Sequence, residues 1–141
     1  CSGGGITRLA QRRIRDAWQQ GLAVSFCADE KALEKLDVKI LAEAARAGDV
    51  FAKDVFETSA YYLGRGLAIL IDVLNPEVIA IGSVFARCED LLRPTMARVL
   101  SEEALKPAVK RCKIVPAGLG EAIGDYAALA IAFAGLSGEL D

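Results

Sequence analysis

The residues best suited to ligand chemistry in this sequence stand where a short apolar run ends in glycine. The stretch NPEVIAIGSVF, residues 75–85, holds four apolar residues between an Asn-Pro pair and Gly82-Ser83. In open α/β sheets, ligands bind beyond the carboxyl ends of the strands. A glycine at such an end admits a ligand close to the backbone, and a following helix offers free N–H groups. This placement would suit a nucleotide, but a strand that ends in glycine for structural reasons alone gives the same pattern, and from the pattern alone we favour the structural interpretation.

Other polar groupings do not complete a catalytic set. Glu121 and Asp125 lie one helical turn apart and could act as paired carboxylates in acid–base chemistry. Acidic residues in the first turn of a helix also stabilise the helix dipole, and we favour that interpretation. The hydroxyl-rich segment 59–62 has no histidine to activate it, and the glycine-rich segment 2–5 lacks the lysine of a P-loop. We therefore predict no catalytic residue in this chain.

Metal binding and disulfide formation are not expected either. The chain has no histidine, and its four cysteines, at positions 1, 27, 88 and 112, form no Cys-x-x-Cys pair. Zinc sites are normally built from closely spaced cysteines and histidines. We therefore expect no zinc or other metal site in this chain, and we expect the reduced cysteines of a cytoplasmic protein.

Composition indicates one packed globular domain. The chain has 141 residues, of which 53% are hydrophobic and 26% charged, and its net charge is −2. This charge does not mark a nucleic-acid-binding surface, and the arginines at positions 8, 12, 13 and 15 are typical of a solvated helix face. No apolar run approaches the roughly 20 residues that a membrane-spanning helix needs, so we expect no membrane association.

Apolar spacing predicts an alternation of helices and short strands. Steps of three and four residues predict a helix of about seven turns from the Asp49 N-cap to Asn75-Pro76. Further helices are expected at about 6–18, 38–44, 89–103 and 122–136, with a possible short helix within 22–37 and strands near 77–82 and 112–116. This order indicates an α/β fold with parallel strands that helices cover on both faces. Because two strands rarely form a stable sheet, we expect further strands from a segment before Cys1 or from another chain.

Several motifs distributed over the chain carry a family resemblance. They are Ser2-Gly3 with Ile6, AARAGD at 44–49, LGRGLA at 63–68, NPE at 75–77 and the closing segment KIVPAGLGEAIGDYAALAIA at 113–132. Together they resemble the C-terminal half of the ROK family, which contains sugar kinases, such as glucokinases, and related transcriptional repressors. The resemblance covers nearly the whole chain. It implies that residues 1–141 form a partial domain of an actin-like, ribonuclease-H-like fold.

The resemblance also implies a nucleotide site. The turn at Gly82 and Ser83 resembles the adenosine motif of sugar kinases, and the implied nucleotide-binding residues are Gly82, Ser83, Val84 and Gly118. The family usually has Gly-Gly at this turn, so Ser83 adds a β-carbon where the backbone would approach adenosine. Asp125 and Tyr126 likewise stand where small residues are common.

The implied function is the nucleotide-side C-terminal portion of an ATP-dependent hexose kinase in carbohydrate metabolism. The parent protein would use ATP, magnesium and a sugar. The family's catalytic aspartate and its phosphate, sugar and zinc motifs lie upstream of Cys1, so we expect the chain alone to be inactive. The alternative is the sugar-sensing domain of a ROK-type repressor, which Ser83 favours and for which nucleic acid is an expected partner. A third interpretation is an interaction module without catalysis. The family resemblance also implies that the protein forms a homo-oligomer.

Overall fold

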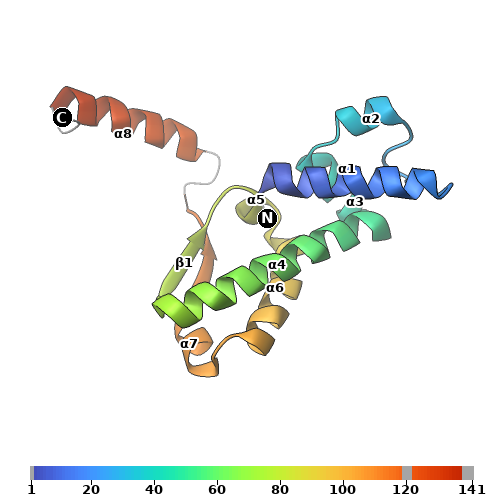
Figure 1. Ribbon diagram of the computed structural model, residues 1–141. Helices are drawn as coiled ribbons and strands as arrows, with labels where there is room; N and C mark the ends of the chain where they lie inside the picture. Colours follow the sequence, from blue (N-terminus) through green and yellow to red (C-terminus); the bar gives the residue numbers. More distant parts are fainter. Residues whose placement is uncertain (1, 119–121, 138–141) are drawn as a thin grey trace.

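In the described part of the chain, residues 2–118 and 122–137, the computed structural model contains eight helices and two strands (Figure 1). They are α1 (Gly3–Gln19), α2 (Glu30–Glu34), α3 (Val38–Arg46), α4 (Val50–Leu74), β1 (Val78–Ile81), α5 (Val84–Arg87), α6 (Glu89–Glu103), α7 (Lys106–Arg111), β2 (Lys113–Pro116) and α8 (Ile123–Ser137). Both strands and the longer helices lie where the sequence predicts them. The short helices α5 and α7 do not follow from the spacing and are additions.

The long helix α4 forms the centre of the fold. Its N-cap Asp49 accepts a hydrogen bond from the Ala52 N–H at 2.8 Å, and its C-cap Asn75 has the left-handed φ of 45° that asparagine tolerates. The helix packs most extensively on α6 and also contacts α1 and α3. The closest approach to α6 is at Gly64, where an added β-carbon would lie 2.8 Å from Cβ of Val99.

The N-terminal helix α1 begins earlier than its apolar spacing indicates. The Ser2 hydroxyl oxygen accepts a hydrogen bond from the Gly5 N–H at 3.2 Å, so Ser2 acts as the N-cap and the three glycines form the first turn. One face of α1 is buried against α3 and α4, with Ile6 and Ile14 almost fully enclosed. The glycine-rich segment is therefore part of a packed helix.

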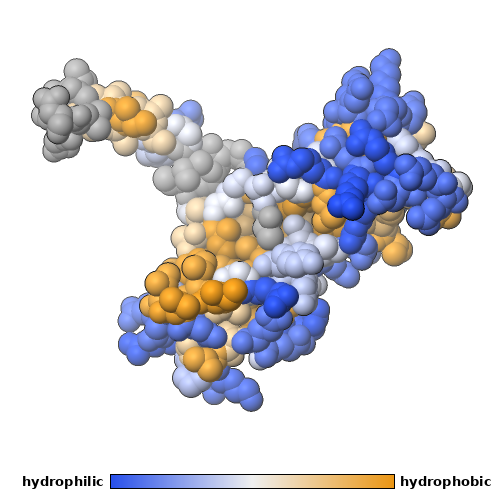
Figure 2. Space-filling model, in the orientation of Figure 1, coloured by the Kyte–Doolittle hydropathy of each residue, from blue (hydrophilic) through white to orange (hydrophobic). Residues whose placement is uncertain are grey.

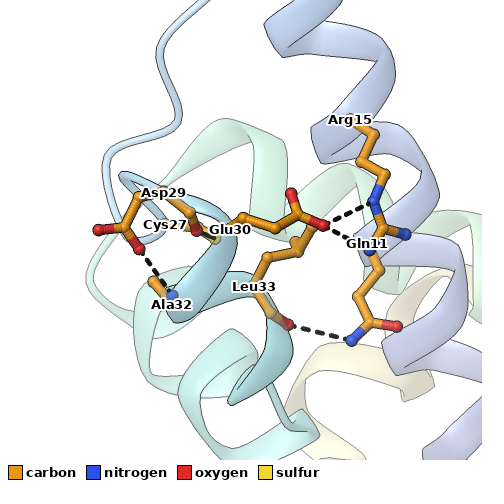
Figure 3. A network of polar contacts seen from close by, with 7 residues as sticks. All are labelled: Gln11, Arg15, Cys27, Asp29, Glu30, Ala32 and Leu33. Atoms are coloured by element: carbon orange, nitrogen blue, oxygen red, sulfur yellow. Dashed lines mark hydrogen bonds and ion pairs between the residues drawn. The ribbon is translucent and has the colours of Figure 1, made fainter.

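Polar contacts hold the short helix α2 against α1 (Figure 3). The Gln11 amide donates to the Leu33 carbonyl at 3.0 Å, and the Arg15 guanidinium contacts Glu30 Oε1 at 2.9 Å. Asp29 caps α2 by accepting from the Ala32 N–H at 2.7 Å. The structure confirms the short helix that the sequence allowed within 22–37. Two of the early arginines are more than a solvated helix face, since Arg15 pairs with Glu30 and Arg13 pairs with Asp54.

The two strands pair in parallel, as predicted. Val78 lies opposite Lys113 and Ile81 opposite Pro116. Backbone hydrogen bonds continue the ladder at both ends, from the Lys113 N–H to the Glu77 carbonyl at 2.8 Å and from the Ala117 N–H to the Ile81 carbonyl at 3.0 Å. The parallel register places the carboxyl ends of both strands at one edge of the sheet.

The prediction that helices cover both faces of β1 is wrong for the described residues. Side chains alternate along a strand, and here Ile79 and Ile81 pack against the helical core whereas Val78 is 54% exposed and Ala80 is also exposed. The last helix, α8, stands apart from this outer face (Figure 1). Figure 2 shows an orange, apolar surface near the C-terminal end of α4. No helix among the described residues is long and apolar enough to span a membrane.

Candidate functional site

The carboxyl ends of β1 and β2 bring Gly82 next to the chain that leads to Gly118. A β-carbon added to Gly82 would lie 3.6 Å from Cβ of Ala117, the residue before Gly118. Gly118 itself is exposed, and among the described residues no atom lies within 4 Å of a β-carbon placed there. The backbone at this edge is therefore open to a ligand on the β2 side.

Ser83 adopts a backbone conformation that normally belongs to glycine. Its φ is 55° and its ψ is −126°, close to the first central position of a type II′ turn. An L-residue in such a sparsely populated region costs about 1–3 kcal/mol. The Ser83 side chain is exposed and makes no capping hydrogen bond to α5, which begins at the next residue. The turn is thus strained without a local capping bond that would offset the strain.

Val84, the third predicted residue, faces inward. Its side chain is 3% exposed, and a β-carbon on Gly3 of α1 would lie 3.1 Å from its Cγ2 atom. The helix that it begins, α5, has only four residues, and the longer helix α6 starts at Glu89. The helix predicted at about 89–103 is present as α6, and α5 is an additional short helix between it and the turn. Val84 can contribute an apolar wall, and α5 is too short to form an anion site.

A pocket of about 600 Å³ adjoins this turn. It lies between the start of α1, helix α3 and helix α5, and its lining residues are Gly3, Asp37, Val38, Lys39, Ala42, Glu43, Arg46, Val84, Arg87 and Cys88. Apolar side chains from α3 and α5 form walls, and charged side chains of both signs complete the lining. A concave surface that combines apolar walls with polar groups can accept a small molecule.

A bidentate ion pair braces the pocket from the α3 side. The Arg46 guanidinium donates to both carboxylate oxygens of Asp90, at 2.8 and 2.7 Å, and also to the Arg87 carbonyl at 3.0 Å. The hydrogen bond from Arg46 lowers the pKa of Asp90 and raises that of Arg46. Burial raises the pKa of the adjacent Cys88 thiol, which therefore stays protonated at neutral pH. These contacts fix α3 against the start of α6.

Arg93 of α6 contacts strand β2 and helix α5. Its guanidinium donates to the Ile114 carbonyl of β2 at 3.0 Å and contacts Glu89 Oε1 at 2.5 Å. It also lies over the Phe85 ring, 5.6 Å from the ring centre. One side chain of α6 thereby contacts both β2 and α5.

The sequence prediction missed the pocket residues that come from α1 and α3. Val38 and Ala42 carry no chemical signal of their own, since both read as ordinary core positions of a helix. The only available signal was the Asp37 N-cap, which fixes where α3 begins. Of the two acidic candidates, Asp125 is exposed in the first turn of α8, whereas Glu121 lies outside the described residues.

No group of three or more histidine, cysteine, aspartate or glutamate side chains within residues 2–118 and 122–137 could hold a metal ion. The described cysteines Cys27, Cys88 and Cys112 are free thiols.

Comparisons with known proteins identify relatives of two kinds. The family model described as ROK family matches residues 1–134. The DNA-binding transcriptional repressor Mlc of Escherichia coli is 36% identical over 72 residues, which are 51% of this chain and 18% of the repressor. A glucokinase of Halalkalibacterium halodurans is 37% identical over 91 residues, which are 64% of this chain and 26% of that protein.

A solved structure gives the corresponding comparison of folds. It is a ROK family glucokinase from Streptomyces griseus in complex with glucose and AMPPNP, with a TM-score of 0.64 and 25% sequence identity. The match covers 86% of this chain and 39% of that one. The chain thus spans between 18% and 39% of the length of these three proteins.

Proposed function

Because the chain belongs to the ROK family, we propose that it forms the nucleotide-binding part of an ATP-dependent sugar kinase. Its fold is the helix-rich α/β, actin-like fold of this family, as the sequence predicted. The observation that carries the proposal is a pocket with apolar and charged walls, which Val84 lines where the chain leaves the carboxyl end of β1. A relative of this fold binds AMPPNP together with glucose.

In this proposal the chain binds and orients the nucleotide. The apolar base lies against Val38, Ala42 and Val84, and the more polar part of the nucleotide lies along the open backbone at Gly82 and Gly118. Ser83 is the exposed side chain next to Gly82, at the carboxyl end of β1. Arg46 and Arg87 bring positive charge to the pocket. Bound ATP would supply the phosphoryl group that the parent protein transfers to a sugar hydroxyl.

The remaining chemistry is assigned to the rest of the parent protein. Phosphoryl transfer needs a base for the sugar hydroxyl and positive charge, usually Mg²⁺, at the phosphates. We propose that the parent provides these groups and binds the sugar, that it works in the cytoplasm, and that it assembles as a homo-oligomer. On this account the 141-residue chain by itself binds nucleotide and has no kinase activity.

The alternative proposal is the sugar-sensing domain of a ROK repressor, and one observation favours it. The strained Ser83 places a β-carbon at the edge where a kinase would need close contact with nucleotide. A sensor of sugar alone does not need that contact. Titration of the intact parent with AMPPNP and with hexoses separates the two: a kinase binds both, whereas a sugar-sensing repressor binds the hexose alone.

The proposed function is tested by two matched valine substitutions. Val38 and Val50 each follow an aspartate N-cap and begin a helix, but only Val38 lines the pocket, whereas Val50 is 79% exposed. Glutamate at the first position of a helix suits the helix dipole, so both variants should fold. Val38→Glu puts a carboxylate into the apolar wall and should weaken AMPPNP binding about tenfold, or about 1.4 kcal/mol, in a calorimetric titration.

The Val50→Glu control should bind within about twofold of the unaltered chain, since a factor of two is near the size of a single weak surface effect. Absence of AMPPNP binding by the unaltered chain, or an equal loss in both variants, would contradict the pocket assignment. Sugar-dependent ATP turnover by the isolated chain would contradict the statement that catalysis needs the rest of the parent.

A further inference from the structure

The C-terminal half of helix α4 presents an exposed stripe on the side that faces away from α6. The stripe follows steps of four, three and four residues, and its members are Tyr62, Gly66, Ile69 and Val73. Its three side chains are 61%, 66% and 74% exposed, and a β-carbon on Gly66 would meet no described residue within 4 Å. Gly64, which contacts α6, lies about 200° around the helix from Gly66, because each residue turns the helix by about 100°. The stripe is therefore open to a second molecule.

The spacing and the sizes of these residues suit an antiparallel pair of α4 helices. Alternating steps of three and four residues are the spacing of a helix seam that packs on another helix. In an antiparallel pair, Gly66 can face Ile69 of a second copy, and Tyr62 then faces Val73 of that copy, because both pairs are centred on the same point of the helix. Each contact joins residues of different size, and the glycine lets the two backbones approach closely.

The charges beside the stripe fit the same arrangement. Arg65 and Asp72 lie on one flank of the stripe, seven residues apart and both exposed. A two-fold axis perpendicular to the helices brings this flank of both copies together, so Arg65 of each copy faces Asp72 of the other. Within one chain, the Arg65 guanidinium contacts Glu103 at 3.1 Å, and Asp72 accepts a hydrogen bond from the Leu105 N–H at 2.9 Å. Opposite charges that meet across an interface select the partner and its orientation.

We propose that this stripe binds a second copy of the chain through antiparallel pairing of the two α4 helices. The family resemblance implies an oligomer without a surface for it, and the stripe supplies that surface independently of the nucleotide site. The seam is only about 17 Å long, at 1.5 Å per residue, and so buries less than the roughly 1,200 Å² of a stable interface. We therefore expect a weak dimer with a dissociation constant of about 100 μM. At much lower concentrations the chain is monomeric and the stripe is exposed.

Sedimentation equilibrium of the 141-residue chain, from well below this concentration to well above it, tests the proposal. The unaltered chain should change from monomer to dimer. Ile69→Glu places a carboxylate of each copy in the seam and should weaken the dimer at least about tenfold. Val50→Glu is the matched control, since Val50 lies at the start of the same helix, outside the stripe, and is 79% exposed. A chain that stays monomeric throughout, or equal association of Ile69→Glu and the control, overturns the proposal.

An exchange of charges tests the antiparallel orientation. Arg65→Glu and Asp72→Arg each place like charges opposite each other in the dimer, so each variant alone should associate about tenfold more weakly. An equimolar mixture of the two variants should recover the dimer, because each copy then meets the opposite charge at both positions. Circular dichroism of each variant checks that α4 and the other helices are retained. Single variants that associate like the unaltered chain, or folded variants whose mixture does not recover the dimer, contradict this pairing.

Discussion

The two ends of helix α4 have the same apolar spacing and opposite surroundings. Near its start, Val55 and Phe56 are at most 1% exposed and lie within the core that α4 forms with α1, α3 and α6. Near its end, Ile71 is still buried, but Leu70 and Leu74, which belong to the same spacing, are 46% and 66% exposed. Val73 is 74% exposed, and Figure 2 shows an apolar surface near this end of α4. The difference teaches that periodicity predicts the helix, whereas tertiary partners decide which of its apolar residues are buried.

The exposed end of α4 continues onto neighbouring elements. Val78 on the outer face of β1, the strand that follows α4, is 54% exposed. Tyr126 and Leu129 of α8, a helix that stands apart from this face in Figure 1, are also more than half exposed. Apolar surface of this extent is typical of an interaction site. Our predictions of further strands beside β1 and of a homo-oligomer each provide a partner for it, and both stay predictions.

The largest expected effect on the free energy of unfolding distinguishes the buried start of α4 from its exposed end. Phe56→Ala leaves a cavity in an enclosed core and should lower the free energy of unfolding by about 3–5 kcal/mol. Val73→Ala removes an exposed side chain and should change it by less than about 0.5 kcal/mol. Urea denaturation of both variants measures this. Comparable losses would mean that the end of α4 is buried in solution, for instance in an oligomer, and the comparison would fail.

A second test uses two glycines of α4 that the sequence does not distinguish. A β-carbon on Gly64 would meet Cβ of Val99 at 2.8 Å and the Met96 carbonyl at 3.0 Å, whereas one on Gly66 would meet nothing within 4 Å. Gly64→Ala should therefore destabilise the fold by about 1–3 kcal/mol through overpacking. Gly66→Ala should stabilise it by up to about 1 kcal/mol through helix propensity. The same sign of effect in both variants would contradict the close packing of α4 on α6.

These glycines show which features of the fold can be predicted from the sequence and which cannot. It identified the long helix, its Asp49 cap and both parallel strands, because these depend on local spacing and on residues such as Asn75-Pro76. It could not distinguish Gly64 from Gly66, since the position of α6 is not encoded within α4. It also expected β1 to be covered on both faces, which composition alone cannot decide.

The candidate site was predictable only in part, for the same reason. Gly82 and Gly118 follow apolar runs, so their place at strand ends could be inferred from the chain itself. The pocket beside them depends on α3 and the start of α1, which reach it from more than 35 positions earlier in the sequence. The strain at Ser83 was also hidden, since a serine after glycine does not reveal its φ.

The smallest expected effect on stability comes from two ion pairs, one beside the pocket and one near the start of the two strands. Arg46 and Asp90 form a bidentate pair beside the pocket. Glu77 precedes β1 and Arg111 ends α7; the Arg111 guanidinium lies 3.6 Å from Glu77 Oε1, and the two side chains are 66% and 79% exposed. Asp90→Asn should lower the free energy of unfolding by about 0.5–1 kcal/mol at pH 7. Glu77→Gln should have no measurable effect.

The contribution of Asp90 also has a defined pH dependence. The hydrogen bond from Arg46 lowers the pKa of Asp90 in the folded chain. Its stabilisation is therefore complete above the ordinary pKa of about 4 and is lost as the pH falls through the lowered value. Thermal denaturation at pH 7 and pH 3 should show the Asp90→Asn difference shrinking at the lower pH. A difference that grows on acidification would contradict this ion pair.

The claim that this chain holds nucleotide at the β1–α5 turn is tested most directly by amide NMR. Two-dimensional ¹H–¹⁵N spectra of the labelled 141-residue chain would be recorded during titration with AMPPNP. We predict that saturable shift changes concentrate at Gly82, Ser83 and Gly118 and at the α3 residues that line the pocket. Unchanged spectra, or changes confined to the exposed end of α4 and to α8, would contradict the proposal.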